Sequence, residues 1–353
     1  MQKFRKIGVL TSGGDAPGMN AAIRAVTLAA EVNGVDVVAI YDGYQGLMEG
    51  NVHDISAKDV SGVIRIGGTF LHSARSPEFM LEEGMQRAIA TCKKHGIDGI
   101  VAIGGDGTFR GATDLTLRGI PCIGIPGTID NDVTASDSTI GYDTALKTTV
   151  TMIDCLRDTC ESHARCNVVE VMGRHAGYIA LESAIATGAE AVIIKEIPHD
   201  EDAIIKRIAD LKANGKRSFI IVVSEGLGNY GETLAPKIEA FTGVETRFAR
   251  FAHVVRGGVP TVADRVMATQ MGAKAVELLL AGKSNLVVCK RNGKIVSEEI
   301  RYALTVDRMF KGKLKDGDLD TFSEEQIESM KALCELRTKE IRRLYDLVDK
   351  VAK

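Results

Sequence analysis

An apolar run that ends in a glycine-rich turn and continues as a helix constrains the fold of this chain more than any other feature. Residues 99–102, Gly-Ile-Val-Ala, have the composition of a buried strand, and Ile103-Gly-Gly-Asp-Gly-Thr-Phe109 follows directly. Residues 110–117 then predict the start of a helix. The glycines let backbone N–H groups approach a ligand, and a helix start favours an anion there. Asp106 in the same turn suggests a cation beside that anion, as in a nucleotide–Mg²⁺ site. The alternative is a tight turn with a solvated aspartate.

The order of strand, glycine-rich turn and helix recurs along the chain, which is typical of βαβ units. Residues 6–11 predict a strand, residues 12–20 a second glycine-rich turn, and residues 19–32 a helix. The strands read as continuous apolar runs, as parallel strands buried on both faces do. We therefore predict an α/β fold of two stacked Rossmann-like three-layer units with mostly parallel sheets, followed by a C-terminal helical extension. Further strands are expected at 34–41, 119–125, 167–172, 191–194 and 219–223, further helices at 82–95, 143–159, 176–186, 200–214 and 261–280, and a hairpin at 286–295.

The C-terminal extension begins with a capping-box pattern, Ser323-x-x-Gln326. We predict a single long helix that packs on the body of the protein or on another subunit, with a coiled-coil dimer arm as the alternative. Its apolar stripe is interrupted by Arg337 and consists of Ile327, Met330, Cys334, Ile341, Leu344 and Val348.

Charge and cysteine content narrow the possible partners and the location. A net charge of −3 gives no long-range attraction to nucleic acid or to an anionic membrane. No apolar run approaches the ~20 residues that span a bilayer, and residues 1–6 lead into a strand without a signal-peptide pattern. The 7 cysteines are scattered and form no C-x-x-C pair, which favours reduced thiols over a disulfide framework or a zinc site. We expect a cytoplasmic protein with no nucleic-acid or membrane partner.

Two acids one residue apart follow a predicted buried strand. Asp130 and Asp132 flank Asn131, and Thr128 lies two residues before Asp130. Phosphoryl transfer to an alcohol needs a base near the hydroxyl and cations near the phosphate, and two such acids can divide these roles. Ligands of doubly wound sheets bind at the carboxyl ends of strands, where this loop and the Asp106 turn are both expected. The alternative is a hydrated, aspartate-rich turn.

Several arginines lie in or beside glycine-rich or strand-end segments, away from amphipathic helix faces. The guanidinium fork matches phosphate oxygens, and an enzyme whose two substrates both carry phosphate needs several such groups. Glu225 at a strand end suits sugar hydroxyls, and His253 is either a substrate ligand or a core histidine. The chain has no Ser/His/Asp triad, HExxH motif or GxxxxGK[ST] loop, so hydrolase and P-loop functions have no support. The arginines are Arg75, Arg165, Arg174, Arg247 and Arg256.

Taken together, these segments resemble the phosphofructokinase family, and most closely its bacterial ATP-dependent 6-phosphofructokinase members. Gly-Gly-Asp-Gly-Thr alone is a weak signal, because NAD kinases and diacylglycerol kinases carry it too. The full set occurs in family order from about residue 5 to 320. It comprises residues 8–24, Gly68-Thr-Phe-Leu, Ile103-Gly-Gly-Asp-Gly-Thr, Pro126-Gly-Thr-Ile-Asp-Asn-Asp132, Val168-Val-Glu-Val-Met-Gly-Arg174, Glu245-Thr-Arg247 and Arg256-Gly-Gly258.

The resemblance implies transfer of the ATP γ-phosphoryl group to the 1-hydroxyl of fructose 6-phosphate, the committed step of glycolysis. By position, Asp130 is the general base with Thr128 beside it, and Asp106 and Asp132 serve the Mg²⁺ that accompanies ATP. The expected ATP-binding residues are Gly14, Arg75, Ser76, Gly105, Asp106, Gly107, Thr108 and Gly111. The expected residues for the sugar phosphate are Thr128, Ile129, Asp130, Arg165, Met172, Gly173, Arg174, Glu225, Arg247, His253 and Arg256.

The resemblance also implies a homotetramer whose active sites are shared between subunits. Arg165 and Arg247 would reach the 6-phosphate from a neighbouring subunit, while Arg75 and Arg174 would offset charge on the moving phosphoryl group. An effector pocket for ADP and phosphoenolpyruvate would lie at a subunit interface. Two arginines that bacterial members carry there are replaced in this chain, so we predict weak or altered effector control. The residues that match the pocket are Arg24, Arg157, Glu190 and Lys216.

The phosphoryl donor and the class of protein each have an alternative. Pyrophosphate-dependent members of the family carry Asp where Gly107 stands and Lys where Gly127 stands, so the two glycines favour ATP. A non-catalytic nucleotide-sensing subunit is an alternative of another class, and retention of Asp130, Asp106 and Arg174 speaks against it.

The predicted domains follow from the same resemblance. The larger, ATP-binding domain comprises residues 1–140 with 251–305, and the smaller, sugar-phosphate-binding domain comprises residues 141–250 with about 306–322. Residues 323–353 form the C-terminal helix.

Overall fold

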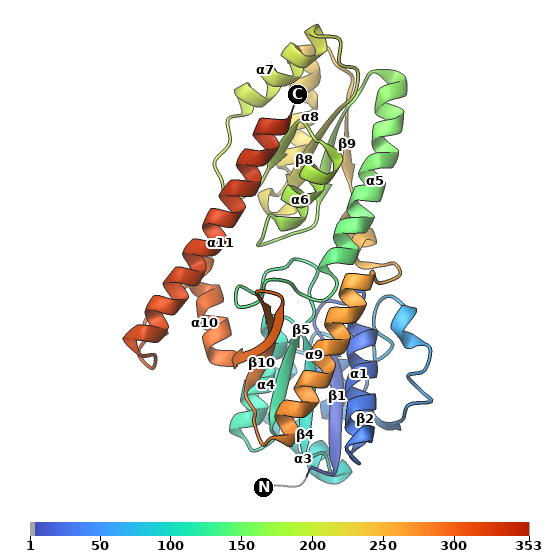
Figure 1. The fold of residues 1–353 in the computed structure, drawn as a ribbon, viewed down its shortest axis with the longest axis vertical. Coiled ribbons are helices and arrows are strands. Elements are labelled where there is room, and N and C mark those ends of the chain that lie inside the picture. Colours follow the sequence, from blue (N-terminus) through green and yellow to red (C-terminus); the bar gives the residue numbers. More distant parts are fainter. Residues whose placement is uncertain (1–3, 353) are drawn as a thin grey trace. The chain divides into compact units, whose positions relative to one another are not determined.

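The computed structural model describes residues 4–352, and the chain divides into two compact units. Each unit has its own sheet and its own helices (Figure 1), which confirms the predicted α/β fold class. Residues 1–3, which the sequence places before the first strand, and residue 353 of the predicted C-terminal helix lie outside the described range. The first unit comprises Met1–Thr144 and Arg256–Leu333, and the second comprises Ala145–Val255 and Cys334–Lys353.

The units differ from the predicted domains in two longer segments and in the few residues at 141–144 and 251–255. Residues 306–322, which the sequence assigns to the smaller domain, lie in the first unit. The C-terminal helix is divided between the two units instead of forming a separate segment. The binding roles of the two predicted domains stay predictions.

The sheet of the first unit has 7 strands in the order β11-β10-β5-β4-β1-β2-β3. The strands from β10 to β2 pair in parallel, while β11 and β3 are antiparallel edge strands. The predicted hairpin is confirmed, because Asn292 and Gly293 turn β10 into β11 with positive φ angles of 50° and 75°. The strands are β1 (Lys6–Ser12), β2 (Asp36–Ile40), β3 (Val52–Ile55), β4 (Gly99–Gly104), β5 (Cys122–Pro126), β10 (Leu286–Arg291) and β11 (Lys294–Glu299).

A topological switch point, where the chain leaves adjacent strands in opposite directions, lies between β1 and β4. Helix α1 leads from β1 to β2, whereas α4 leads from β4 to β5 in the opposite direction across the sheet. Because parallel crossovers are right-handed, α1 and α4 cover opposite faces; α9 packs beside α1, and α10 contacts α4 (Figure 1). The loops after β1 and β4 therefore diverge at one sheet edge, where doubly wound sheets bind ligands. The helices are α1 (Met19–Val32), α2 (Gly43–Glu49), α3 (Glu82–His95), α4 (Asp106–Leu117), α9 (Val262–Leu280) and α10 (Ile300–Phe310).

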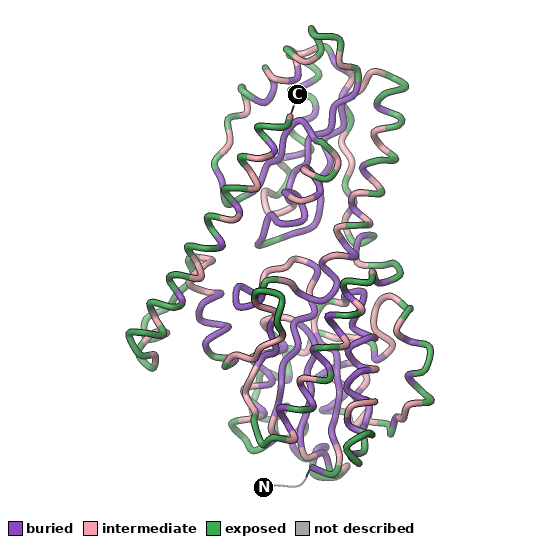
Figure 2. Tube along the Cα trace, viewed as in Figure 1, coloured by how far each residue is buried: buried purple, intermediate pink, exposed green. Residues whose placement is uncertain are grey.

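The central strands are buried on both faces, as their apolar runs predict (Figure 2). Ile7 and Val9 of β1, and Ile100 and Ile103 of β4, have no exposed surface. Burial of apolar area stabilises the fold by about 25 cal/mol per Å². The loops that follow these strands are therefore anchored in the best-packed part of the unit.

The second unit has a parallel sheet of 4 strands in the order β7-β8-β6-β9. Val168 of β6 and Ile221 of β8 form one core with Ile208 of α7 and Leu234 of α8. The chain leaves β6 toward β7 but leaves β8 toward β9, so a second switch point lies between β6 and β8. The elements are α5 (Tyr142–His163, which starts in the first unit), β6 (Cys166–Val171), α6 (Tyr178–Thr187), β7 (Ala191–Ile193), α7 (Glu201–Ala213), β8 (Phe219–Ser224), α8 (Tyr230–Thr242) and β9 (Thr246–Arg250).

The C-terminal extension is the single long helix that the sequence predicts, α11 (Glu324–Val351). The capping box is confirmed: the Ser323 N–H donates to Oε1 of Gln326 at 2.9 Å, and the Gln326 N–H donates to Oγ of Ser323 at 3.2 Å. Met330 is buried in the first unit and Ile341 in the second. The apolar stripe therefore packs on this chain.

The cysteines are free thiols. Cys155 is exposed, Cys334 is partly buried and the others are buried. Burial raises the pKa of Cys92 and of Cys289 to about 12, so these thiols stay protonated at neutral pH. In the described part of the chain, no helix combines the length and the apolar character that crossing a membrane requires.

Candidate active site

Two glycine-rich turns meet at the switch point of the first unit. Oγ1 of Thr108, in the turn after β4, donates a hydrogen bond of 3.0 Å to the carbonyl of Ser12 at the end of β1. Position 104 accepts only glycine, because a Cβ on Gly104 would lie 2.3 Å from the Ser12 carbonyl oxygen. A Cβ on Gly105 or Gly107 would meet no atom within 4 Å. The N-terminus of α4 therefore opens onto unobstructed backbone, as an anion site at a helix start needs.

The loop that carries Arg75 and Ser76 is tied to the same edge of the sheet. Oγ of Ser73 donates to the carbonyl of Gly13 at 2.7 Å. Oγ of Ser76 donates to Oε1 of Gln45 at 2.7 Å, while Arg75 is exposed. The structure thus brings this loop next to the glycine turn after β1.

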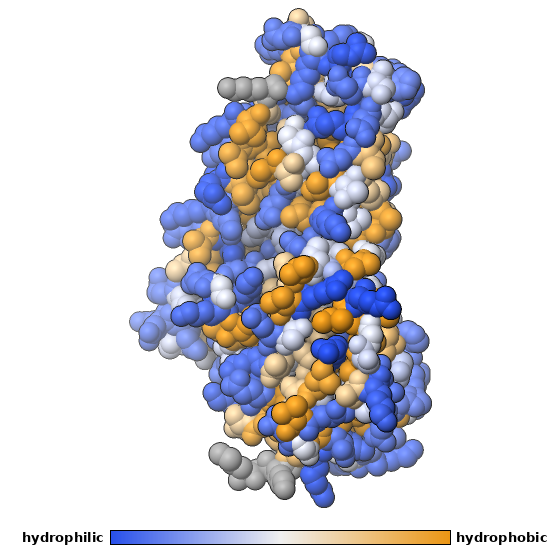
Figure 3. All heavy atoms as spheres, turned by 45° about the vertical axis from the view of Figure 1, so that its right-hand side comes forward, coloured by the Kyte–Doolittle hydropathy of each residue, from blue (hydrophilic) through white to orange (hydrophobic). Residues whose placement is uncertain are grey.

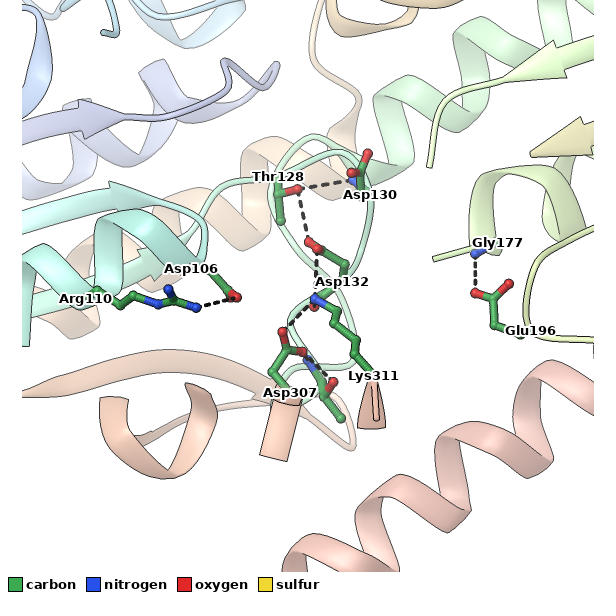
Figure 4. A network of polar contacts seen from close by, with 10 residues as sticks. Asp106, Arg110, Thr128, Asp130, Asp132, Gly177, Glu196, Asp307 and Lys311 are labelled. Carbon is green, nitrogen blue, oxygen red and sulfur yellow. Dashed lines mark hydrogen bonds and ion pairs between the residues drawn. The ribbon is translucent and has the colours of Figure 1, made fainter. Parts of the chain in front are cut away.

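The loop after β5 holds Thr128, Asp130 and Asp132 in a tight turn (Figure 4). Oγ1 of Thr128 accepts the N–H of Asp130 at 3.3 Å and donates to Oδ1 of Asp132 at 3.4 Å. Asn131 has a φ of 51°, in the left-handed region that asparagine tolerates. Ile129 is fully buried and anchors the turn, so a substrate contact at this position would come from its backbone.

Three carboxylates from separate segments lie close enough to interact electrostatically: Asp106, Asp132 and Asp307, which we name the acidic cluster. Nζ of Lys311 lies 2.6 Å from Oδ2 of Asp307 and 3.1 Å from Oδ2 of Asp132 (Figure 4). Arg110 reaches Oδ2 of Asp106 at 3.9 Å and is mostly exposed. Burial, followed by repulsion from Asp307, raises the pKa of Asp106 to about 6, although Lys311 acts in the opposite direction.

The charge balance of the acidic cluster fits a divalent cation. Burial is the largest cause of the raised pKa of Asp106, and the neighbouring carboxylates of Asp307 and Asp132 add to it while Lys311 and Arg110 oppose it. Among residues 4–352, no group of three or more His, Cys, Asp or Glu side chains is placed to hold a metal ion. Mg²⁺ in nucleotide sites is held by one or two carboxylates together with substrate phosphates, and the predicted pair Asp106 and Asp132 matches that donor set.

Arg256 lies against the glycine turn after β1. Its Nη1 donates to the carbonyl of Asp15 at 3.1 Å, and a Cβ on Gly14 would lie 2.9 Å from the same nitrogen. The structure thus joins one residue predicted for the sugar phosphate to one predicted for ATP. Gly111 differs, because a Cβ there would lie 2.6 Å from the ring of Tyr44. Packing alone explains this glycine.

At the switch point of the second unit, the structure brings Gly173 and Glu225 together. The N–H of Gly173 donates to Oε1 of Glu225 at 3.3 Å, and Oγ of Ser224 donates to the carbonyl of Gly173 at 2.9 Å. Gly173 has a φ of 126°, which favours glycine. Next to it, Met172 is buried and Arg174 is exposed. These residues form one edge at the carboxyl ends of β6 and β8.

Two further polar residues of the second unit lie in loops or at helix starts. His253 is exposed in the short 3-10 helix Ala252–Arg256. Glu196, which the sequence analysis did not select, accepts the N–H of Gly177 with Oε1 at 2.7 Å, just before α6 (Figure 4).

Arg165 and Arg247 lie at the other end of the sheet of the second unit. Arg165 directly precedes β6, and Arg247 is the second residue of β9. Both pair with Glu245, Arg165 through Nε at 2.8 Å. Because β6 has 6 residues and a strand rises ~3.3 Å per residue, the two edges are roughly 20 Å apart. The structure therefore does not bring these arginines to Gly173 and Glu225 within one chain.

Three of the predicted effector residues meet in the second unit. Glu190 has no exposed surface, and its Oε1 lies 2.7 Å from Nζ of Lys216 and 3.8 Å from Nη1 of Arg157. Its Oε2 accepts the N–H of Ile220 at 2.5 Å. Arg24 belongs to α1 in the first unit.

Asp307 and Lys311 are the residues of this site that sequence reasoning missed. They lie four residues apart at the end of α10, a spacing that places both on one face of a helix. The contact from Lys311 to Asp132 spans 179 positions, so no local pattern reveals it. The sequence signal that could have revealed them is an acid on the mainly apolar buried face of α10, followed four residues later by a lysine.

Comparison with known proteins agrees with this geometry. A family model described as Phosphofructokinase matches residues 6–279. The ATP-dependent 6-phosphofructokinases of Bacillus licheniformis and Bacillus subtilis are each 50% identical to the chain over 297 residues, which is 84% of this chain and 93% of each relative. The structure of phosphofructokinase from Saccharomyces cerevisiae superposes with a TM-score of 0.83 at 32% identity and covers 92% of this chain and 50% of the yeast chain. The chain belongs to the phosphofructokinase family.

Proposed function

We propose that this chain transfers the γ-phosphoryl group of ATP to the 1-hydroxyl of fructose 6-phosphate, giving fructose 1,6-bisphosphate and ADP. The observation that carries the proposal is that Asp130 and Asp132, after β5, and Asp106, at the start of α4, lie at one sheet edge in a chain of this family. The names of the relatives that are 50% identical support the same reaction. We expect the enzyme to act in glycolysis and in the cytoplasm.

Asp130 is the proposed general base. A carboxylate within hydrogen-bonding reach of the 1-hydroxyl accepts its proton as the oxygen attacks phosphorus. Thr128 holds the backbone of Asp130, which restricts the direction of the carboxylate. Asp106 and Asp132 would hold Mg²⁺, whose chemistry is to neutralise charge on the ATP phosphates. Arg174 supplies a further positive charge to the moving phosphoryl group.

The two substrates draw on different sets of residues. The open backbone at Gly105 and Gly107, together with the start of α4, supports binding of the ATP phosphates. Gly14, Arg75, Ser76 and Thr108 complete the proposed ATP site. The residues proposed for the sugar phosphate are Met172, Gly173, Arg174, Glu225, His253 and Arg256.

Active sites shared between subunits follow from the two edges of the second sheet. Arg165 and Arg247 lie at the edge opposite Gly173, so one chain cannot use both edges on one substrate molecule. Exposed apolar side chains support contacts between copies. Figure 3 shows such side chains gathered in patches among polar ones, and Val259 and Val262 are 60% and 79% exposed. We propose a homotetramer whose subunits exchange these arginines.

ATP is the proposed donor in preference to pyrophosphate. Gly107 leaves the space beside the start of α4 open, which suits a donor larger than pyrophosphate. A Cβ on Gly127 would lie 2.8 Å from the Met19 side chain and 3.2 Å from that of Ile103. A lysine at this position would therefore require at least the terminal methyl group of Met19 to move.

Effector control is proposed to be weak or altered. The Glu190 carboxylate faces both Arg157 and Lys216, so much of their positive charge is already neutralised. A strong shift of the fructose 6-phosphate saturation curve by ADP or phosphoenolpyruvate would overturn this part of the proposal.

A coupled assay with purified protein tests the proposed reaction. We expect turnover with ATP and fructose 6-phosphate in the presence of Mg²⁺, and little or none with pyrophosphate. Asp130→Asn should lower kcat by roughly 10²–10⁴-fold, as expected for loss of a general base. Turnover of Asp130→Asn close to that of the parent would contradict the assigned base, and no turnover by the parent would favour a nucleotide-sensing subunit.

A further inference from the structure

Lys311 is a largely buried cation that none of the assignments above uses. It follows the last residue of α10 and lies beyond residues 6–279, which the family model matches. Its side chain is 12% exposed, whereas Lys313, two positions on, is exposed. Because a lysine is rarely buried without a specific partner, its contacts indicate its role.

The ammonium of Lys311 is fully engaged by the acidic cluster (Figure 4). Nζ donates to Oδ2 of Asp307 at 2.6 Å, to Oδ2 of Asp132 at 3.1 Å and to the carbonyl oxygen of Asp132 at 3.1 Å. An ammonium has three N–H donors, so Lys311 would have to release one of these acceptors to bind a phosphate oxygen. Two of the three donors hold Asp132, through its side chain and its backbone.

Asp307 and Lys311, at the end of α10, contact the loop after β5 at two residues, Thr134 and Asp132. Oδ1 of Asp307 accepts the N–H of Thr134 at 3.0 Å and its Oγ1 at 2.6 Å. Lys311 holds Asp132, two residues earlier. Asp132 and Thr134 lie two and four residues after Asp130, so these contacts restrict the backbone that orients the proposed base.

The charge of Lys311 acts on the same carboxylates. The contacts of Nζ with the carboxylates of Asp307 and Asp132 favour the charged form of Lys311. The ammonium therefore stays protonated at neutral pH. A fixed positive charge in this position repels a divalent cation that approaches Asp132 or Asp106.

We propose that Lys311 is a positioning residue of the phosphoryl transfer: it fixes Asp132 and the turn that carries Asp130, and it weakens metal binding by the acidic cluster in the absence of ATP. The inference rests on the proposed function. It extends that function because it implies that Mg²⁺ binds mainly when ATP is present and only weakly to the free protein.

The variant Lys311→Met tests whether Lys311 positions the reacting groups or only supports the fold. We expect kcat to fall at least roughly tenfold while the KM for fructose 6-phosphate changes little, because a small misplacement of reacting groups is costly. In the ATP-free protein, electron paramagnetic resonance titration should show roughly three- to tenfold tighter Mn²⁺ binding, because the repelling charge is gone. A residue that only supports the fold would not strengthen metal binding.

Two matched variants serve as controls. Lys311→Arg keeps the charge and should keep the Mn²⁺ affinity of the parent. Lys313→Met removes an exposed lysine nearby and should change neither kcat nor Mn²⁺ affinity.

A parent-like kcat, or an unchanged or weaker Mn²⁺ affinity, of Lys311→Met would overturn the proposal. If that variant does not fold, Lys311→Gln takes its place with the same expectations, and loss of the fold in both would assign Lys311 a structural role instead. Lack of turnover by the parent would count against the proposed function alone, because the Mn²⁺ titration still reports on the charge of Lys311.

Discussion

The ionised form of Asp106 is destabilised in the native state. Burial raises its pKa to about 6, and repulsion from Asp307 adds to the shift. The native state therefore holds this proton more tightly than the unfolded chain, in which an aspartate has a pKa of about 3.9. The stability that the proton contributes is fully present below that value and is lost as the pH rises through about 6.

We expect Asp106→Asn to raise the thermal unfolding midpoint at pH 8 in the absence of divalent cations, because it removes an unfavourable buried charge. At pH 5 the carboxyl of the parent is largely protonated, so the gain should shrink or vanish. Differential scanning calorimetry at the two pH values measures this difference. Asp114→Asn, an exposed change on the same helix, is the control. Equal gains of Asp106→Asn at both pH values would contradict the assignment.

Gly111 and Gly107 form a matched pair on α4. A methyl group at position 111 would lie 2.6 Å from the ring of Tyr44 and 2.8 Å from that of Phe79, and these rings stack with centroids 4.1 Å apart. We expect Gly111→Ala to destabilise the protein by about 1–3 kcal/mol through overpacking. Gly107→Ala meets no neighbour within 4 Å and should be neutral or slightly stabilising. Urea unfolding of both variants measures the difference, and equal effects would argue against the packing role of Gly111.

Elements with a strong local pattern were predictable, and those defined by distant packing were not. The strands around Ile103 and the turn at Asn292-Gly293 follow from local sequence. The helix α8 was missed because Pro236 lies inside it, and α2 and β3 are short. The helix α10 was missed although it has a clear buried face.

The same distinction applies to the candidate site. The loops of Asp106 and Asp130 could be placed together because parallel strands end at one sheet edge. Lys311 could not, because its position depends on how α10 packs. The structure also explains Arg337, which interrupts the predicted stripe of α11: its guanidinium is buried and pairs with Glu340 at 3.2 Å.

The burial pattern of α11 predicts which of its apolar residues stabilise the second unit. Ile341 is 3% exposed, whereas Leu336, on the same helix, is 59% exposed. We expect Ile341→Ala to destabilise by about 2–5 kcal/mol, because a cavity adds to the lost apolar burial. Leu336→Ala should change stability by less than about 0.5 kcal/mol, as surface substitutions usually do. Chemical denaturation measures both, and similar effects of the two variants would mean that α11 does not pack as described.

At the scale of the whole molecule, the residues proposed to bind the sugar phosphate lie at two opposite edges of the second sheet, which supports the proposal that subunits share active sites. Gly173 and Glu225 lie at the carboxyl ends of the strands, and Arg165 and Arg247 lie at the opposite edge. The ion pairs of Arg165 and Arg247 with Glu245 are partly exposed and therefore weak. Both arginines can leave Glu245 to bind a phosphate group. We therefore propose that these side chains act on a partner copy.

Subunit complementation tests this arrangement. Asp130→Asn and Arg165→Ala should each have low activity, the first through loss of the base and the second through loss of a phosphate contact made across a subunit interface. Mixed and reassembled, the two variants should form hybrids in which some sites receive an intact Asp130 from one subunit and an intact Arg165 from its neighbour. Activity of the mixture should then exceed the sum of the two separate variants.

The control is Asp130→Asn mixed with Asp106→Asn, because Asp130 and Asp106 belong to the same unit of one chain and no hybrid site would contain both intact. Hybrids verified by native mass spectrometry that show no gain would place Arg165 in the active site of its own chain or outside the active site altogether.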